Sequence, residues 1–357
     1  MLRRQIENVI MAPPLWLRPI LYPLSLLYSL AARTHRVLYR VGILNTSTLP
    51  RPVISVGNLT VGGGGKTPVV MWLARELLER GLRPAVLTRG YGRSGKGVQV
   101  VDRASKWQNF GDEPFMMAGR LGNVPIAVSK DRYLAGSHLL KDHEVDLFIL
   151  DDGFQHHALY RDLDIVVVDS LARFGNGRLI PAGVLREPVK RLASSDFIIV
   201  TRSSGPDADL EKYLNRYNPV QVMWAEYSPA GLKQVGPGKM EPLAEIPAAP
   251  MVAFCGIAQP EGFRLTLRKA GVNVAELLTF PDHHTYNGLD VERIRNTAER
   301  YNAAGLVTTE KDAVRWPADG GLLPVYELRV KLDVHNAGDL VKNILDLVSG
   351  SSEDNVK

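Results

Sequence analysis

A glycine-rich segment that ends in Lys-Thr has the residue types needed to bind a polyphosphate. It reads Thr60-Val61-Gly62-Gly63-Gly64-Gly65-Lys66-Thr67. It follows the apolar run 52–56 and precedes a helical pattern over 69–80. Glycines let backbone N–H groups turn toward phosphates, and a helix N-terminus adds unpaired N–H groups and a positive dipole end. We therefore expect a P-loop for a nucleoside triphosphate, in which Lys66 reaches the β- and γ-phosphates and Thr67 binds Mg²⁺.

Two positions in this segment depart from common P-loop patterns. Thr60 stands where the usual pattern has its first glycine, so a glycine-rich turn without a ligand is the alternative interpretation. The strand before the segment and the helix after it favour the P-loop. Val61 stands where the ParA/MinD-like partitioning ATPases carry a second lysine, which argues against that class.

A second apolar run ends in two acids, Asp151 and Asp152. In P-loop enzymes such a strand lies beside the P-loop strand and delivers an acid to Mg²⁺ or to its water. Adjacent carboxylates suit a hard divalent cation that binds through oxygen. The alternative is an aspartate that only starts a turn. The upstream P-loop favours the metal role, and either acid is a candidate.

Three further segments carry side chains suited to phosphoryl transfer. Arg89 follows the strand 84–88 and can grip phosphate oxygens, although it also fits a basic surface loop. Asp112 begins a helical segment, where it is either an N-cap or a base for an acceptor hydroxyl. His283 and His284 offer an imidazole that could orient such a base. The charged clusters 183–188 and 309–312 fit either a site or a salt-bridged surface.

The elements that must position these residues alternate between strands and helices. We expect strands at 52–57, 84–88, 124–128, 146–151, 164–168 and 196–201, and helices at 67–80, 112–121, 130–141 and 207–216. Several strands are continuous apolar runs, which is typical of a parallel sheet covered on both faces. The fold class is therefore α/β, a doubly wound, mostly parallel sheet with ligands at the carboxyl ends of its strands.

The later part of the chain predicts a smaller α/β unit. Residues 228–250 are rich in Pro, Gly and Ala and suggest an irregular connection or a small antiparallel insert. Strands at 251–256, 305–308 and 324–329 and helices at 260–270 and 288–301 follow. We expect a P-loop core over 46–240, a C-terminal α/β part over 241–349, which can dock on the same sheet, and a disordered tail over 350–357.

Composition limits the partners of the chain. The single cysteine, Cys255, excludes an intrachain disulfide and fits a reducing cytoplasm. The net charge of +5 arises within residues 1–40, and residues 41–357 are balanced in charge. The protein is therefore not a generally basic nucleic-acid binder. We expect neither a nucleic-acid partner nor an obligate protein partner.

The N-terminal segment 1–45 is both basic and apolar. Leucines, Trp16 and tyrosines are flanked by arginines, and Arg18, Pro19 and Pro23 interrupt the apolar run. This pattern favours a helix that lies in the membrane interface and faces anionic headgroups, with a kink at Pro23. A core helix of a soluble domain and a membrane-spanning helix are the alternatives.

Taken together, these segments resemble the tetraacyldisaccharide 4'-kinase family of lipid A biosynthesis. The resemblance lies in GNLTVGGGGKTP (57–68), LTRGYGR (87–93), GDEP (111–114), ILDDGFQHH (149–157), GRLIPAGVLREP (177–188), FPDHHTY (280–286) and TTEKDA (308–313). It extends from the N-terminal segment to about residue 330, and Thr60 is usual in that family.

The resemblance implies an alcohol-group phosphotransferase at the cytoplasmic face of the inner membrane. It would use ATP and Mg²⁺ to phosphorylate the 4'-hydroxyl of a tetraacylated glucosamine disaccharide 1-phosphate, giving lipid IVA. By this analogy Asp112 is the base and His283, taken over His284, assists it. Lys66 and Arg89 neutralise phosphoryl charge. Thr67, Asp151 or Asp152, and Glu187 handle the metal.

Two other functions remain as alternatives. A P-loop GTPase of the metallochaperone type needs a guanine-reading Asn-Lys-x-Asp segment, and the chain offers only Thr309-Glu310-Lys311-Asp312. A membrane-associated scaffold with a vestigial P-loop is the second. Nucleotide turnover with and without a lipid acceptor distinguishes the three.

Overall fold

The computed structural model describes residues 14–218, 221–236, 238, 240–242, 248–317 and 323–354. The apolar runs form the parallel centre of its sheet, in the order β7-β6-β1-β5-β2-β4. These strands are β1 (Val53–Gly57), β2 (Pro84–Thr88), β4 (Ile126–Val128), β5 (Leu147–Asp151), β6 (Leu163–Asp169) and β7 (Phe197–Thr201). They are almost wholly buried, as expected for strands covered on both faces. The short strand β3 (Gln99–Val100) pairs antiparallel with β4 at the edge.

Helices cover both faces of this sheet, so the doubly wound fold is confirmed. The α-helices are α3 (Lys66–Glu79), α4 (Asp112–Leu121), α5 (Arg132–Asp142), α6 (Ala208–Asn215) and α10 (Gly338–Asp354); the 3-10 turns are η1 (Leu15–Leu17), η2 (Trp107–Asn109) and η3 (Val189–Ser194). Apolar residues of α3, α4 and α10 pack together on one face. Residues of α5 pack on the other face, as do those of α6 and η3.

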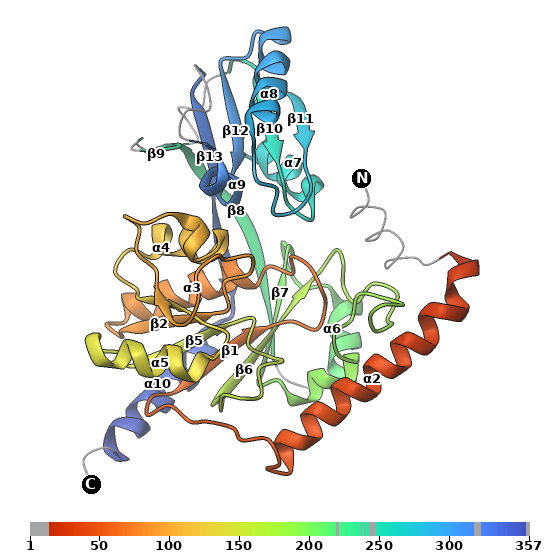
Figure 1. The fold of residues 1–357 in the computed structure, drawn as a ribbon, viewed down its shortest axis with the longest axis vertical. Coiled ribbons are helices and arrows are strands. Elements are labelled where there is room, and N and C mark those ends of the chain that lie inside the picture. The colour runs from red at the N-terminus through yellow and green to blue at the C-terminus, as the bar shows by residue number, and fades with distance from the viewer. Residues whose placement is uncertain are drawn as a thin grey trace.

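A second, smaller lobe continues the same sheet (Figure 1). It contains β10 (Met251–Cys255), β11 (Val274–Thr279), β12 (Gly305–Thr309), α7 (Pro260–Lys269), α8 (Gly288–Arg300) and α9 (Glu310–Arg315). Two long strands, β8 (Val222–Gln234) and β13 (Val325–His335), pair antiparallel and connect the lobes. The first residues of β8 pair with β7, and those of β13 pair with β12. β9 (Met240–Glu241) pairs with β8.

The structure bears on the expected division near residue 240 in three places. Residues 228–250 were expected to be an irregular connection or a small antiparallel insert; β8 runs through Pro229 as a strand and pairs antiparallel with β9 and β13, which agrees with the second alternative. Residues 237, 239 and 243–247 lie outside the described residues. The chain then returns to the first lobe, where Leu340 and Ile344 of α10 join the core around α3. α10 also extends to Asp354, so 350–354 are helical rather than disordered, and 355–357 lie outside the described residues.

The N-terminal segment forms the long helix α2 (Arg18–Arg40), which runs along the outside of the first lobe (Figure 1). Residues 15–40 are long and apolar enough to cross a membrane, yet only 6% of that apolar stretch is buried. The alternative of a core helix is therefore wrong. The helix continues through Pro23. Residues 1–13 lie outside the described residues.

Candidate active site

The glycine-rich loop connects β1 to α3 and is held open by its neighbours. Gly65 has a φ of 82° directly before α3, a conformation that favours glycine. The Val61 N–H donates to the Val184 carbonyl at 2.8 Å, and the Arg186 N–H donates to the Leu59 carbonyl at 2.7 Å. The segment 183–188 thus braces the loop on the side away from the helix.

Lys66 lies at the start of α3 and points toward two acceptors. Its Nζ donates to Asn58 Oδ1 at 3.1 Å and lies 3.4 Å from Asp152 Oδ1. Arg186 donates to both oxygens of Asp152, at 3.0 and 2.8 Å. Burial alone would raise the pKa of Asp152, but the charges of Lys66 and Arg186 hold it below its usual value. An ionised Asp152 therefore links the P-loop lysine to the segment 183–188.

Asp151 occupies a different environment from its neighbour. β5 pairs with the P-loop strand β1, with Asp151 opposite Val56, as the sequence predicted. Thr88 donates a hydrogen bond of 2.9 Å to Asp151 Oδ2, while Oδ1 is buried without a partner. Burial, with the charges of Glu113 and Asp152, raises the pKa of Asp151 to about 7. A buried carboxylate oxygen that lacks a donor is one that a cation would satisfy.

These features fit a P-loop Mg²⁺ site with few protein ligands. Among the described residues there is no group of three His, Cys, Asp or Glu side chains arranged to hold a metal. A P-loop metal requires only the loop hydroxyl, one acid, phosphate oxygens and waters. Thr67 lies in the first turn of α3 and Asp151 at the end of β5, so these two are the candidates for the hydroxyl and the acid.

Asp112 and His283 meet across the two lobes. Asp112 is the first residue of α4, and His283 lies between β11 and α8 of the second lobe. His283 Nδ1 is 2.9 Å from Asp112 Oδ2. His284 instead contacts Asp290 at 2.9 Å and stacks on Phe280, so of these two histidines it is His283 that contacts Asp112.

The acid of this pair is buried among cations. Burial alone would raise the pKa of Asp112, but its hydrogen bond with His283 and the charges of Lys311 and Arg315 lower the pKa below the usual value. Arg315 Nη1 lies 3.5 Å from Asp112 Oδ2. Asp112 is therefore ionised at neutral pH, as a general base must be.

The structure also gives the surroundings of Arg89 and Glu187, which the sequence indicates as candidates for phosphate and metal binding. Arg89 is exposed at the end of β2, where its charge acts on the buried Arg132. Glu187 accepts from Arg36 of α2 at 2.6 Å and from Arg191 at 2.9 Å. These ion pairs tie Glu187 Oε2 to the N-terminal helix, while its Oε1 is buried without a hydrogen-bond partner. A metal role for Glu187 therefore stays a prediction.

Sequence reasoning missed three site residues. Lys311 and Arg315 lie on α9, whose first residues were recognised only as part of a charged cluster. Arg132 starts α5 after β4, and burial together with the charge of Arg89 lowers its pKa. Arg132 follows a strand that ends at the same edge of the sheet as the P-loop strand, and this position could have indicated a site residue. No pattern in the sequence indicated that α9 would lie next to Asp112.

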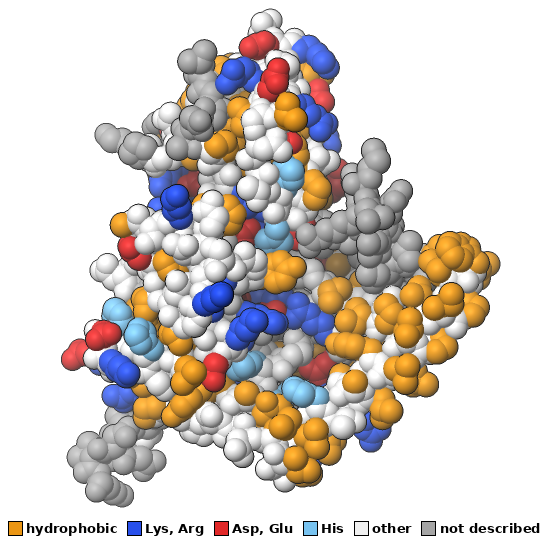
Figure 2. Space-filling model, viewed as in Figure 1, with side chains coloured by type: hydrophobic (Ala, Val, Ile, Leu, Met, Phe, Trp, Pro, Cys, Tyr) orange, Lys and Arg blue, Asp and Glu red, His pale blue; other side chains and the backbone are white. Residues whose placement is uncertain are grey.

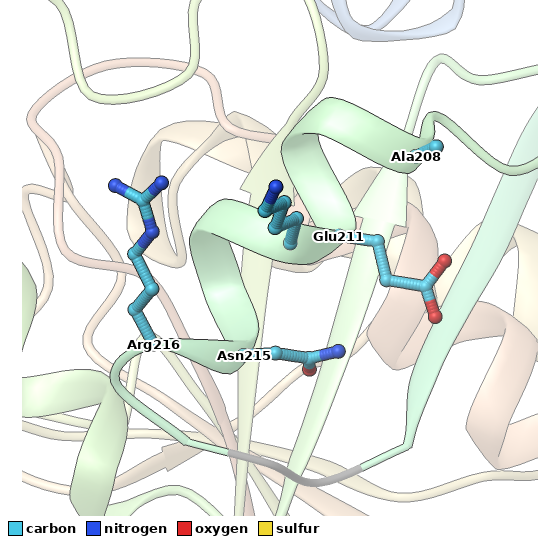
Figure 3. Close-up of a pocket in the computed structure, with 5 residues that line it drawn as sticks. Ala208, Glu211, Asn215 and Arg216 are labelled. Atoms are coloured by element: carbon cyan, nitrogen blue, oxygen red, sulfur yellow. The ribbon is translucent and has the colours of Figure 1, made fainter.

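The surface around the site is strongly cationic. Lys and Arg side chains gather in a hollow between α2 and the lobes (Figure 2). A separate hollow of ≈ 460 Å³ lies over α6 and is lined by Ala208, Glu211, Lys212, Asn215 and Arg216. There the side chains of Glu211 and Arg216 point away from one another (Figure 3). That hollow is open and brings no reactive groups together.

Comparison with known proteins identifies relatives over most of the chain. The family model described as tetraacyldisaccharide-1-P 4'-kinase matches residues 17–349. The chain is 40% identical over 304 residues to a tetraacyldisaccharide 4'-kinase of Pelobacter propionicus, covering 83% of this chain and 82% of that protein. It is 39% identical over 306 residues to that of Geobacter sulfurreducens, covering 84% and 85%.

A solved structure is similar in fold as well as in sequence. LpxK from Aquifex aeolicus, crystallised in complex with ATP, superposes with a TM-score of 0.73 and 32% identity. The match covers 93% of this chain and 99% of that protein. The resemblance found from the sequence motifs is thereby confirmed.

Proposed function

This chain belongs to the tetraacyldisaccharide 4'-kinase family, and we propose that the P-loop and the Asp112–His283 pair form its catalytic site. The protein uses ATP to phosphorylate the 4'-hydroxyl of a tetraacylated disaccharide 1-phosphate. The observation that carries the proposed site is the 2.9 Å contact between Asp112 and His283, since it joins the two lobes through an ionised base.

In the proposed reaction, Asp112 accepts the proton of the 4'-hydroxyl. The hydroxyl oxygen forms a bond to the γ-phosphorus of ATP, and the bond from that phosphorus to the β,γ-bridging oxygen breaks. ADP leaves with the electron pair of the broken bond. Lys66 and Arg89 neutralise charge on the transferred group, which is the main demand of phosphoryl transfer.

Thr67 and Asp151 are the residues that would hold Mg²⁺. The ion bridges phosphate oxygens and offsets their charge when bound. Asp152 has a different role in this proposal: with Arg186 it keeps Lys66 directed into the loop. Glu187 supports the same segment from the side of α2.

We also propose that α2 brings the enzyme to an anionic membrane surface. An acyl-chain substrate stays in the bilayer, so the catalytic site must reach the interface. The apolar side chains that α2 exposes can enter the acyl region, and its arginines can face anionic headgroups. The cytoplasmic face of the inner membrane is the side where ATP is supplied.

The experiment that tests the site is phosphate transfer from γ-labelled ATP to purified tetraacyldisaccharide 1-phosphate. Asp112→Asn should lower kcat by about 10²- to 10⁴-fold, the usual contribution of a positioned base. ATP binding should change little, because Asp112 is not part of the P-loop. Asp142→Asn, at the exposed end of α5, is the matched control. Transfer by Asp112→Asn at the wild-type rate would exclude Asp112 as the base.

A further inference from the structure

Lys311 reaches the catalytic pair from the second lobe. Its Nζ lies 3.1 Å from His283 Nε2, the ring nitrogen that does not face Asp112. It also lies 3.0 Å from Glu113 Oε1 and 3.4 Å from Asp282 Oδ1. Burial alone would lower the pKa of Lys311, but these carboxylates and Asp112 raise it above its usual value. The side chain is therefore a buried ammonium between the two lobes.

The two short contacts of the His283 ring favour one arrangement of its protons. An ammonium group carries donors and no acceptor, so a hydrogen bond from Lys311 requires His283 Nε2 to be unprotonated. An ionised carboxylate accepts only, so the contact with Asp112 requires a proton on Nδ1. Two neighbours on different elements thus specify the same neutral tautomer.

We propose that Lys311 is a positioning residue that holds His283 as the Nδ1–H tautomer and leaves Asp112 as the only proton acceptor of the pair. This inference rests on the proposed function of Asp112. Because Nε2 accepts from Lys311, the imidazole cannot take the proton of the 4'-hydroxyl. His283 instead donates to Asp112 and fixes the direction of its carboxylate.

Asp282 is a charged group that would favour a proton on His283 Nε2, but its Oδ2 lies 3.8 Å from that nitrogen, beyond hydrogen-bond distance, whereas Lys311 Nζ lies at 3.1 Å. Asp112 and Glu113 approach from α4, Asp282 lies beside the histidine in its own loop, and Lys311 and Arg315 extend from α9. The Tyr91 ring, from the loop after β2, packs against the imidazole at 5.4 Å between centroids.

Lys311 itself is held by a buried network at the start of α9. Its neighbour Glu310 accepts from Arg120 of α4 at 2.9 Å, from Arg329 at 3.2 Å and from the Val330 N–H at 3.1 Å. Thr309 caps the helix by accepting from the Asp312 N–H at 3.1 Å, and the Asp312 carboxylate accepts from Tyr286 at 2.9 Å. Because the residues on both sides of Lys311 are held by these contacts, the Lys311 side chain keeps a fixed direction. A fixed direction is needed for a donor that selects one tautomer of His283.

The first test is the pH dependence of kcat/KM for Lys311→Met and Lys311→Arg. The acidic limb reports the ionisation of Asp112. Loss of the cation should move that limb to higher pH by about half a unit to one unit, and should lower kcat roughly tenfold or more. Lys311→Arg, which keeps a donor and a charge, should preserve the limb. Lys331→Met, an exposed lysine on β13, is the control.

The second test needs no substitution of Lys311. Nitrogen-15 NMR of histidine-labelled wild-type protein, with the signals assigned by His283→Gln, should show a protonated Nδ1 and a bare Nε2. A proton on Nε2 in the wild type, or a Lys311→Met profile that superimposes on the wild type, would overturn the inference. If Asp112→Asn stays active, the proposed function itself fails. If it is inactive and either of those two results is found, only the role of Lys311 fails.

Discussion

At the scale of single residues, Asp152 shows how the site holds its P-loop lysine. Its φ of 52° lies in the left-handed region, which few residues other than glycine adopt. Aspartate tolerates this region better than most, and here the ion pairs with Lys66 and Arg186 support it. The turn after β5 is thereby joined to both the P-loop and the segment 183–188.

The two histidines in that turn predict a loss of stability in mild acid. Burial, with the positive charges of Arg132 and Arg161, lowers the pKa of His156 to about 4. Burial, with the charges of Arg161 and Arg191, lowers the pKa of His157 to about 4. Between pH 6.5 and 4 the unfolded chain therefore binds protons that the folded chain does not, and the free energy of unfolding falls. Allowing for their partial exposure, we expect a loss on the order of 1 kcal/mol per histidine, complete below about pH 4.

Urea unfolding at about pH 7.5 and about pH 5 measures this effect. The double variant His156→Gln, His157→Gln should lose less stability than the wild type between the two conditions. His335→Gln, at the exposed end of β13, should behave like the wild type. Equal losses in the wild type and the double variant would show that neither histidine is responsible.

The residues of the site were predictable to different extents. The P-loop and the acids after β5 follow from a local pattern, since strand, glycines, Lys-Thr and helix are contiguous in sequence. The pairing of Asp112 with His283 rested on resemblance alone, because 171 positions separate them. Lys311 and Arg315 could not be predicted as site residues, because their contact with Asp112 depends on how the second lobe packs against α4.

At the scale of elements, the strands that connect the lobes were the hardest to predict. β8 contains Pro229 and Gly231, which in sequence suggest a turn. The structure accommodates them where the pairing with β13 shifts register, between Arg329 and Val330. The apolar central strands were predicted well because burial on both faces leaves a continuous hydrophobic run. A strand that changes neighbours along its length leaves no such run.

The contact between α2 and the segment 178–191 predicts that one arginine controls docking of the N-terminal helix. Arg36 pairs with the buried Glu187, Ser25 donates to the Leu179 carbonyl at 2.9 Å, and Arg178 stacks over the Tyr22 ring at 4.2 Å. Arg36→Met should weaken docking by about 1.5–3 kcal/mol, the range for hydrogen bonds to charged groups. Amides of α2 should then exchange with solvent at least tenfold faster, as measured by hydrogen–deuterium exchange without lipid.

Arg33→Met, an exposed arginine on the same helix, is the control and should exchange like the wild type. Exchange of α2 in Arg36→Met at the wild-type rate would mean that the ion pair does not hold the helix.

At the scale of the whole molecule, the site depends on parts that are distant in sequence. One continuous sheet carries both lobes, and α10 returns to the first lobe after the second is complete. The proposed base, Asp112, comes from one lobe and His283 from the other. A fragment that ends near residue 240 would lack β13 and α10 as well as His283, so we expect it to lack part of the core of the first lobe.

The surface of the molecule is also asymmetric. On α2, polar and aromatic side chains contact the protein, as Ser25 and Arg36 do. Large apolar side chains of η1 and α2 point outward: Leu15 and Trp16 of η1, and Ile20, Leu24, Leu26, Leu27, Leu30 and Val37 of α2. Figure 2 shows this apolar strip beside the cationic hollow. A helix with a continuous exposed apolar side is typical of an element that binds another apolar phase, such as a membrane.

This asymmetry predicts that membrane binding depends on α2 and not on apolar residues elsewhere. Leu24 and Leu27 are 47% and 62% exposed. Burying a leucine in an apolar phase contributes about 1.5–3 kcal/mol, so Leu24→Asp with Leu27→Asp should weaken binding to phosphatidylglycerol-containing vesicles by on the order of 10²-fold or more. Vesicle co-sedimentation measures the loss.

The matched control places the same change on the second lobe, far from α2. Leu265 and Leu289 are 53% and 76% exposed on α7 and α8. Leu265→Asp with Leu289→Asp should leave vesicle binding unchanged, because that lobe does not enter the interface. Both double variants should phosphorylate detergent-solubilised substrate at similar rates, since neither touches the site. Equal vesicle binding by the two variants would show that α2 is not the membrane-binding element. Another surface of the protein would then have to bring the site to its lipid substrate.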